Sequence, residues 1–154
     1  MRHSGQPILY NGDKLQTLVL AKEVGLDIPP TLVTTEKIKV KTFKAKQGDI
    51  ITKTIDIQFH LNEVKQNETY MLYINNFSDE RIDSLPDTFF PALFQKQIEK
   101  KYELRIFYVA DKFFPVAIFS QTNDKTNIDF RHYDRNKPNR NVPYLLPPDL
   151  EKKT

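Results

Sequence analysis

The side chain best suited to chemistry is a lysine inside an apolar, β-prone segment. Lys53 lies in the run IITKTI at residues 50–55, where isoleucine occupies three of the six positions. A buried ammonium group costs several kcal/mol of folding free energy unless a partner compensates its charge. A bound phosphate would be such a partner. The alternative is that Lys53 faces water from one side of a two-faced strand, and the spacing leaves both interpretations open.

Two other segments carry an acidic residue two positions before an arginine. The pairs are Glu103 with Arg105 and Asp129 with Arg131. If both segments are strands, each acid and its arginine project from the same face, because successive side chains of a strand alternate. The two strands can then supply a charged site. They can equally hold cross-strand ion pairs on a solvated sheet face, worth about 0.2–1 kcal/mol each.

Several other kinds of site are excluded by the residue types present. The three histidines, His3, His60 and His132, are isolated and form no metal-binding pair. The four glycines are scattered, so there is no glycine-rich phosphate loop, and there is no serine-centred elbow. The absence of cysteine excludes disulfides, thiolate metal sites and a cysteine nucleophile.

The elements that must position the charged residues are mainly strands. A helix is predicted over residues 14–24, with Gly25 as its end. Residues 35–47 fit an exposed strand or a short helix, residues 77–87 a polar break with one helical turn, and residues 136–148 a surface loop. The predicted strands are residues 31–34, 49–55, 57–61, 69–74, 92–98, 103–109, 113–120 and 128–133.

Two pairs of these strands should be adjacent in an antiparallel sheet. The alternation of residues 57–61 and 69–74 suits a pair, and a tight turn at residues 110–112 should join 103–109 to 113–120. The predicted fold class is therefore α+β, with a mostly antiparallel sheet and an N-terminal helix.

The order of these pieces resembles the ATP-grasp ligase family. The pieces are Asp13-Lys14 at a helix start, the run GLDIP, the strand lysine, the run QKQI at residues 95–98, and the two acid-x-arginine motifs. Within the family, residues 90–121, IDFRHYD and KPNRNVPYLLPPDLE look like the peptide maturases of the grasp-with-spasm systems, which make graspetides, a class of RiPP. The resemblance covers residues 13–151. It implies the central lobes of an ATP-grasp fold.

The resemblance also implies a division of the chain. Residues 1–12 would be a polar lead, residues 13–90 the small lobe, and residues 91–154 the adenine hinge and the start of the large lobe. The chain looks truncated at both ends, because the family's N-terminal lobe is missing and the segment DLEKKT begins a helical pattern that stops at once. We therefore expect the chain alone to be inactive, with function inherited from a longer parent.

The implied activity is ATP-dependent ligation. In the resembling maturases, ATP phosphorylates an Asp or Glu side chain of a precursor peptide, and a hydroxyl or amine attacks the acyl phosphate to give an ester or amide crosslink. By position, Lys14 and Lys53 match lysines that contact the ATP phosphates, and Glu103 matches an acidic residue near the ribose. The implied adenine hinge comprises Gln95, Lys96, Gln97 and Ile98. Arg105 and Arg131 match arginines that are directed at the transferring phosphate.

The sequence departs from the family pattern in three ways. Residues 58–78 contain no glycine, whereas the family usually places a glycine-rich loop there. His132 and Tyr133 follow Arg131 where the family has an asparagine. The family's Mg²⁺ ligands would lie beyond the C-terminal end, so no metal ligands are assigned within this chain.

Composition sets the remaining expectations. The formal net charge of +3 is nearly balanced, which argues only weakly for nucleic acid. No apolar run approaches the length of about 18 residues that suggests a membrane span, and the N-terminus lacks an apolar signal core. We expect a cytoplasmic protein whose partners are ATP and a precursor peptide, not nucleic acid or membrane. A non-catalytic nucleotide-binding fragment and a β-rich interaction domain without nucleotide are the alternatives.

Overall fold

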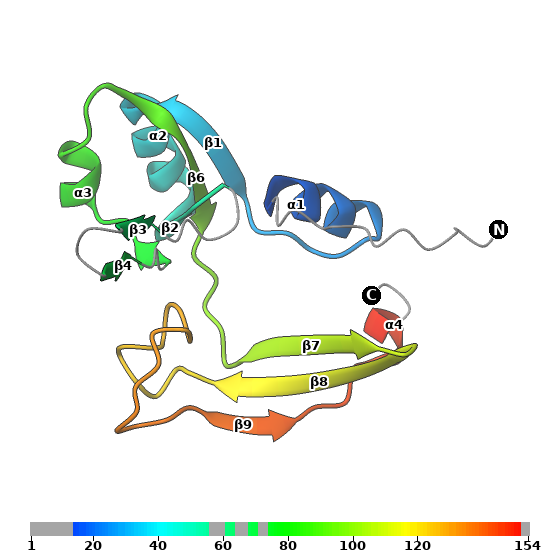
Figure 1. Ribbon diagram of the computed structural model, residues 1–154. Helices are drawn as coiled ribbons and strands as arrows, with labels where there is room; N and C mark the ends of the chain where they lie inside the picture. Colours follow the sequence, from blue (N-terminus) through cyan, green and yellow to red (C-terminus); the bar gives the residue numbers. More distant parts are fainter. Residues whose placement is uncertain (1–13, 56–60, 64–67, 71–73, 152–154) are drawn as a thin grey trace.

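The computed structural model describes residues 14–55, 61–63, 68–70 and 74–151. Two antiparallel sheets dominate it, joined by an extended segment at residues 97–102 (Figure 1). The first sheet has the strand order β1-β6-β2-β5 and the second β7-β8-β9. The predicted fold class, α+β with antiparallel sheets and an N-terminal helix, is confirmed.

The first sheet carries two helices packed together over its core. Its strands are β1 Thr31–Glu36, β2 Ile50–Lys53, β5 Asn75–Asn76 and β6 Thr88–Lys96, and the helices are α2 Lys37–Gln47 and α3 Asp79–Asp83. The buried core cluster comprises Val40, Ile50, Ile82 and Phe94. Because β6 pairs with β1 and β2 over residues 88–96, the predicted lobe boundary at residue 90 falls inside a strand.

Residues 37–47, for which the sequence left two possibilities, form the helix α2. Val40 is fully buried and Phe43 packs against the same core, a spacing of three that matches one helix face. The helix ends at Gly48, whose φ of 79° is a conformation that glycine adopts at little cost. Four of its five lysines lie no more than 3.7 Å from a carboxylate oxygen, so these four do not form a free basic patch.

The N-terminal helix ends as the sequence predicts. Helix α1 spans Lys14–Glu23, and Gly25 follows with a φ of 76°. The N–H of Gly25 donates to the carbonyl of Lys22, and the N–H of Leu26 donates to the carbonyl of Ala21. This pair of hydrogen bonds is the Schellman motif, which satisfies carbonyls left unpaired at a helix end.

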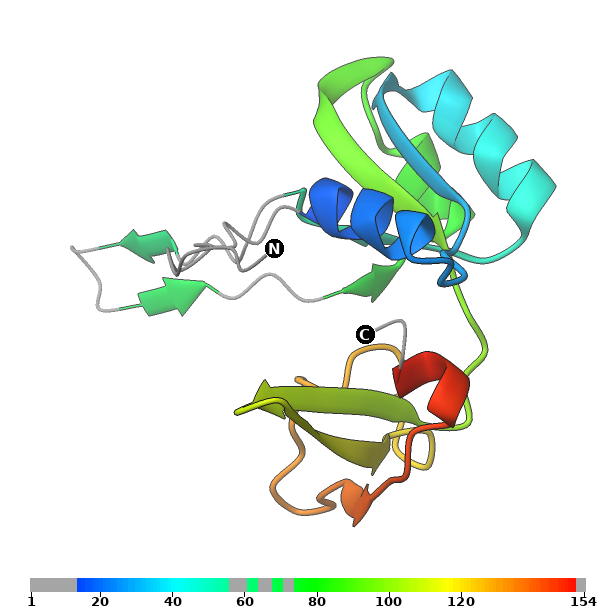
Figure 2. The same cartoon turned by 90° about the vertical axis from the view of Figure 1, so that its right-hand side faces the viewer.

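The second sheet is built on a hairpin that the sequence predicts correctly. Its strands are β7 Glu103–Val109, β8 Lys112–Phe119 and β9 Arg140–Pro143. Ala110 and Asp111 have φ values of 48° and 58°, as expected of a two-residue turn whose twist matches the flanking strands. A second hairpin, β3 Leu61–Glu63 with β4 Glu68–Tyr70, projects from the first sheet (Figure 2). The rest of the pair predicted at 57–61 and 69–74 falls largely outside the described residues.

Two predictions near the C-terminal end are wrong. Residues 128–133 form turns instead of a strand, because Asp129 accepts a hydrogen bond from the N–H of Arg131 two residues later. Such a local bond competes with the ladder of a sheet. The predicted loop at 136–148 contains β9, which pairs with β8. Pro143 is tolerated there because β9 is an edge strand of the described sheet, and a short helix, α4 Pro148–Glu151, follows.

Candidate functional site

A cavity of about 170 Å³ lies where the first sheet meets the linking segment and the second sheet. We call it the inter-sheet pocket. Six of the nine residues predicted from the sequence line it: Lys53, Gln95, Lys96, Gln97, Ile98 and Glu103. Strand β2 ends at Lys53, β6 ends at Lys96, and β7 begins at Glu103, so the pocket gathers strand ends from both sheets. The structure thus brings most of the predicted site together.

Lys53 is half-buried and pairs with a neutral amide. Its Nζ donates to Oε1 of Gln95 at 2.7 Å, and Nε2 of Gln95 donates to the Thr31 hydroxyl at 2.9 Å. Burial, followed by the nearby cations of Lys14, Lys100 and Arg131, lowers the pKa of Lys53, although Asp129 partly opposes the shift. A partly desolvated cation in cationic surroundings favours an anionic ligand. The hydrogen bond to Gln95 also disfavours the alternative that Lys53 simply faces water.

Lys14 lies beside the pocket without lining it. It is the first residue of α1, and its Nζ donates to the Thr54 hydroxyl at 2.7 Å, just beyond the end of β2. Its charge contributes to the lowered pKa of Lys53. Lys14 therefore adds positive charge to this end of β2.

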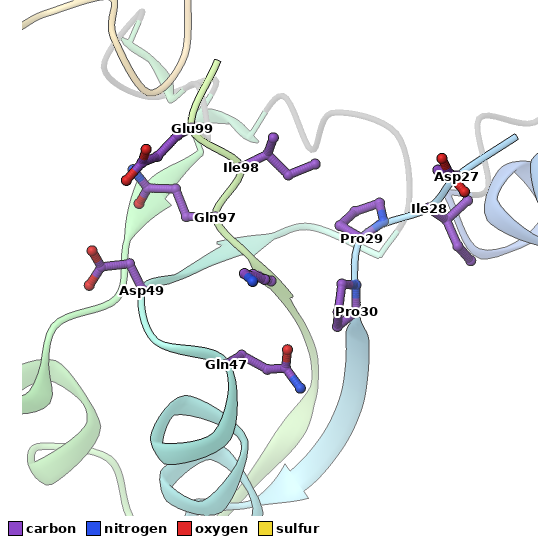
Figure 3. Close-up of a pocket in the computed structure, with 10 residues that line it drawn as sticks. Asp27, Ile28, Pro29, Pro30, Gln47, Asp49, Gln97, Ile98 and Glu99 are labelled. Atoms are coloured by element: carbon purple, nitrogen blue, oxygen red, sulfur yellow. The ribbon is translucent and has the colours of Figure 1, made fainter.

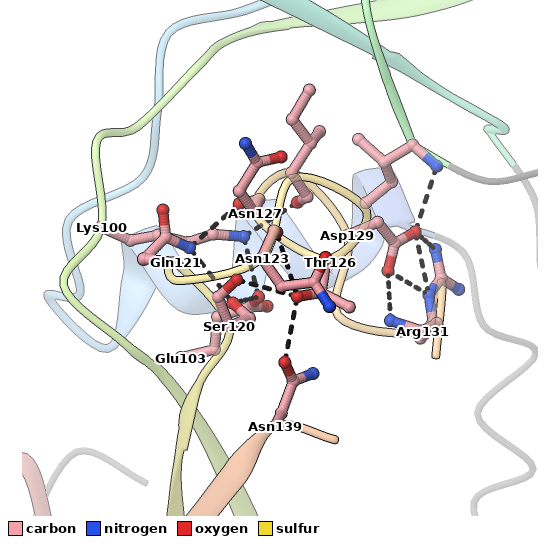
Figure 4. A network of polar contacts seen from close by, with 12 residues as sticks. Lys100, Glu103, Ser120, Gln121, Asn123, Thr126, Asn127, Asp129, Arg131 and Asn139 are labelled. Carbon is pink, nitrogen blue, oxygen red and sulfur yellow. Dashed lines mark hydrogen bonds and ion pairs between the residues drawn. The ribbon is translucent and has the colours of Figure 1, made fainter. Parts of the chain in front are cut away.

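Glu103 is held by a polar network that the sequence did not reveal (Figure 4). Its Oε1 accepts from Nζ of Lys100 at 2.8 Å and from the Ser120 hydroxyl at 3.1 Å. Lys100 also donates to the carbonyl of Ile128 at 2.8 Å, which ties the linking segment to the loop between β8 and β9. Lys100 lines the pocket. In the sequence, the position of Lys100 in the charged run at residues 99–101 is its one indication of a functional role.

Asp129 and Arg131 interact directly instead of lying side by side on a strand. Nε of Arg131 is 2.8 Å from Oδ1 of Asp129, and Nη2 is 2.6 Å from Oδ2. Burial alone would raise the pKa of Asp129, but hydrogen bonds from the Arg131 side chain and from the backbone of Ile74 and Arg131 outweigh it and hold that pKa below its usual value. Arg131 does not line the inter-sheet pocket, although its charge acts on Lys53.

Arg105 faces a different cavity. It lies on β7 two residues after Glu103, and its guanidinium carbon is 5.4 Å from the centre of the Phe107 ring. With Phe107, Phe130 and Tyr133 it lines a cavity of about 490 Å³. The structure therefore does not bring Arg105 into the inter-sheet pocket.

A larger cavity of about 570 Å³ lies against the same linking segment (Figure 3). Its charged lining residues are Asp27, Asp49, Glu99 and Lys96. Three carboxylates against one ammonium make this cavity unsuitable for a polyphosphate. The charges of the lining residues therefore favour the inter-sheet pocket as the polyphosphate site, although it is the smaller of the two cavities.

The described part of the chain offers neither a metal-binding cluster nor a membrane-spanning helix. No group of three or more His, Asp or Glu side chains is placed there so that it could hold a metal ion. The described residues thus show no preformed set of side-chain ligands for Mg²⁺. No described helix has the length and apolar character needed to cross a bilayer.

Comparison with known proteins identifies similar solved structures. No protein-family model and no curated protein matches the sequence. The RiPP-associated ATP-grasp ligase of Chryseobacterium gregarium, solved with ADP and a leader and core peptide, is 30% identical, with a TM-score of 0.83 over 97% of this chain and 45% of that one. The macrocyclase MdnC of Microcystis aeruginosa, bound with precursor peptide MdnA, is 31% identical, with a TM-score of 0.70 over 93% of this chain and 44% of that one.

A more distant match supports the fold alone. The ATP-grasp ligase PsnB, solved with a minimal precursor, Mg and ADP, is 19% identical, with a TM-score of 0.57 over 93% of this chain and 40% of that one. The chain thus spans less than half the length of the structures it matches. The resemblance found in the sequence is confirmed, and the chain has the fold of the RiPP-associated ATP-grasp ligases.

Proposed function

We propose that this chain is the nucleotide-binding part of an ATP-grasp ligase that modifies a precursor peptide. The observation that carries the proposal is the inter-sheet pocket, where the half-buried Lys53 has a neutral partner beside the segment Gln95 to Ile98. A polyphosphate would give this cation the charge compensation that Gln95 cannot. The similarity to ligases solved with ADP and with peptide supports the same assignment.

Residues 95–98, at the end of β6 and the start of the linking segment, are the proposed adenine site. The N–H groups of Lys96 and Gln97 donate to the carbonyls of Pro30 and Asp49, at 3.0 and 2.8 Å, which fixes the backbone. Among the described residues, the N–H of Ile98 has no such partner. It is thus available to a ring-nitrogen acceptor such as N1 of adenine, whereas guanine presents an N–H at that position.

The phosphates and ribose would lie toward the cations and Glu103. Lys53, with Lys14 behind it, would contact phosphate oxygens as a compact charge with three donors. Glu103 would accept from a ribose hydroxyl while Lys100 and Ser120 hold its carboxylate. The pocket is smaller than the roughly 300–1,000 Å³ of drug-sized ligand sites. It therefore suits one ring system, with the phosphates at its edge beside Lys53.

The proposed chemistry proceeds in two steps. A carboxylate oxygen of an Asp or Glu in the precursor peptide attacks the terminal phosphorus of ATP, and ADP leaves. A hydroxyl or amine then attacks the carbonyl carbon of the acyl phosphate, phosphate leaves, and the proton of the attacking group is released. The product is an ester or amide crosslink. Arg131, whose charge acts on Lys53, is the proposed donor to the transferring phosphate, where a planar guanidinium stabilises spreading charge. Arg105 faces a different cavity and is given no role in this step.

Calorimetric titration of the chain with ATP and with GTP tests the nucleotide assignment. We expect ATP to bind about tenfold more tightly, because guanine presents an N–H where adenine presents an acceptor and so leaves the N–H of Ile98 without a partner. Equal affinity for the two nucleotides would contradict the adenine site. No binding of either would favour a β-rich interaction domain, in which the same charges form surface ion pairs.

A further inference from the structure

The carboxylate of Asp129 connects the two sheets at the edge of the inter-sheet pocket. Its Oδ2 accepts a hydrogen bond from the N–H of Ile74 at 3.1 Å. Ile74 lines the pocket and immediately precedes β5, which pairs with β2, the strand that carries Lys53. Asp129 itself lies in the loop between β8 and β9. The hydrogen bond thus joins segments that are 55 residues apart in the chain (Figure 4).

The same carboxylate fixes the orientation of Arg131. The side-chain contacts at 2.8 and 2.6 Å engage Nε and Nη2 together, and the backbone N–H of Arg131 adds a third donor at 3.1 Å. A two-pronged contact of this kind restrains the plane of the guanidinium group. The Asp129 side chain is 4% exposed, whereas that of Arg131 is 34% exposed. Arg131 is therefore held on its inner side and remains reachable by a ligand from outside.

Lys53 lies on β2 of the first sheet and Arg131 in the loop between two strands of the second sheet, and their charges already influence each other. For both to contact one polyphosphate, the distance between the sheets and the direction of the guanidinium group must be set together. Asp129 is bonded to Arg131 and to the N–H of Ile74, the residue just before the strand that pairs with the Lys53 strand. A misplacement of about 1 Å at such a site can reduce the rate by about 100-fold.

We infer that Asp129 is a positioning residue, which holds Arg131 toward the terminal phosphate and holds the Lys53 strand at the matching distance. The inference rests on the proposed function, since it requires a bound nucleotide. It predicts a specific dependence on the terminal phosphate: Asp129 should matter for ATP, through Arg131, and much less for ADP.

A double-mutant cycle tests this coupling. Dissociation constants for ATP and ADP are measured by calorimetry for the chain, Asp129→Asn, Arg131→Ala and the double variant. We expect Asp129→Asn to weaken ATP about tenfold, the scale of a charge-assisted contact, and to leave ADP within about twofold. In the Arg131→Ala background, Asp129→Asn should change ATP affinity by less than about twofold, because asparagine still offers an oxygen to the N–H of Ile74 and the effect through Arg131 is absent once Arg131 is removed.

Two variants keep the test decisive if Asp129→Asn does not fold. Asp129→Glu keeps the charge but moves the carboxylate by one methylene, and Ile74→Pro removes the N–H that joins the sheets while leaving the Asp129–Arg131 pair. Both should lose preference for ATP over ADP. Equal losses of affinity for ATP and ADP, or additive effects in the cycle, would overturn this inference. The proposal that the pocket binds a nucleotide would be unaffected. If the unmodified chain binds neither nucleotide, the proposed function itself fails.

Discussion

Replacement of Lys53 by methionine separates a phosphate-binding lysine from an ordinary strand residue. Methionine keeps the length and the apolar stem and removes the charge. In the structure, one donor of Nζ is used by Oε1 of Gln95, at 2.7 Å. Two of its three donors therefore remain for phosphate oxygens.

The magnitude follows from those donors. A hydrogen bond to a charged group contributes about 1.5–3 kcal/mol, so Lys53→Met should weaken ATP about 10- to 150-fold. Adenosine, which has no phosphate, should bind the variant and the unmodified chain alike. Without ligand, stability should change by about 1 kcal/mol or less, because the unpaired Gln95 oxygen is offset by the removal of a desolvated cation.

The assay is calorimetric titration with ATP and with adenosine, accompanied by urea unfolding. The matched control is Lys46→Met, which removes an exposed lysine near the end of α2. Lys46→Met should bind ATP as the unmodified chain does. If Lys53→Met also bound ATP with unchanged affinity, the phosphate assignment would be refuted.

Three further predictions concern stability and turnover. Phe94→Ala should lower the free energy of unfolding by about 3–5 kcal/mol in urea titrations, because Phe94 is 2% exposed and packs edge-on against Phe77. The pKa of Asp129 is lowered in the folded state, so its ionised carboxylate should stabilise the fold above the usual pKa of 3.8. This contribution should be lost as the pH falls below 3.8. Urea unfolding curves of the chain and of Asp129→Asn should therefore become alike at such low pH. The chain alone should release ADP only near the background rate even with a precursor peptide and Mg²⁺ present, because Glu103, the carboxylate among the described residues that line the inter-sheet pocket, already accepts from Lys100 and Ser120. Robust magnesium-dependent turnover would contradict this.

The parts of the fold that the sequence predicted are those specified by local chemistry. Gly25 ends α1 because it adopts a positive φ, and the residues at 110–112 make the hairpin turn between β7 and β8. Helix α2 was ambiguous, because its alternating lysines suit a strand as well as a helix. Only packing of Val40 and Phe43 against the core decides between the two.

The wrong predictions arose where tertiary contacts override local preference. The residues around Asp129 look β-prone, yet its carboxylate caps a turn and accepts from Ile74, a partner distant in sequence. Strand β9 has little strand character and forms because β8 offers it a free edge. A single sequence contains neither of these contacts.

The candidate site shows the same limit. Residues 95–98 are contiguous, so their shared location could be predicted, and the structure adds Lys53 to them through Gln95. Lys100 was missed because its importance depends on contacts with Glu103 and with the carbonyl of Ile128. The catalytic roles of Arg105 and Arg131 remain predictions.

A crystal structure of the chain with ADP tests the central claim most directly, because two cavities that are both lined by residues 96–98 compete for the nucleotide. Our account places adenine against residues 95–98 within the inter-sheet pocket, with the N–H of Ile98 bonded to the ring and a phosphate oxygen within hydrogen-bond distance of Nζ of Lys53. ADP bound instead in the cavity lined by Asp27, Asp49 and Glu99, or away from Lys53, would contradict it.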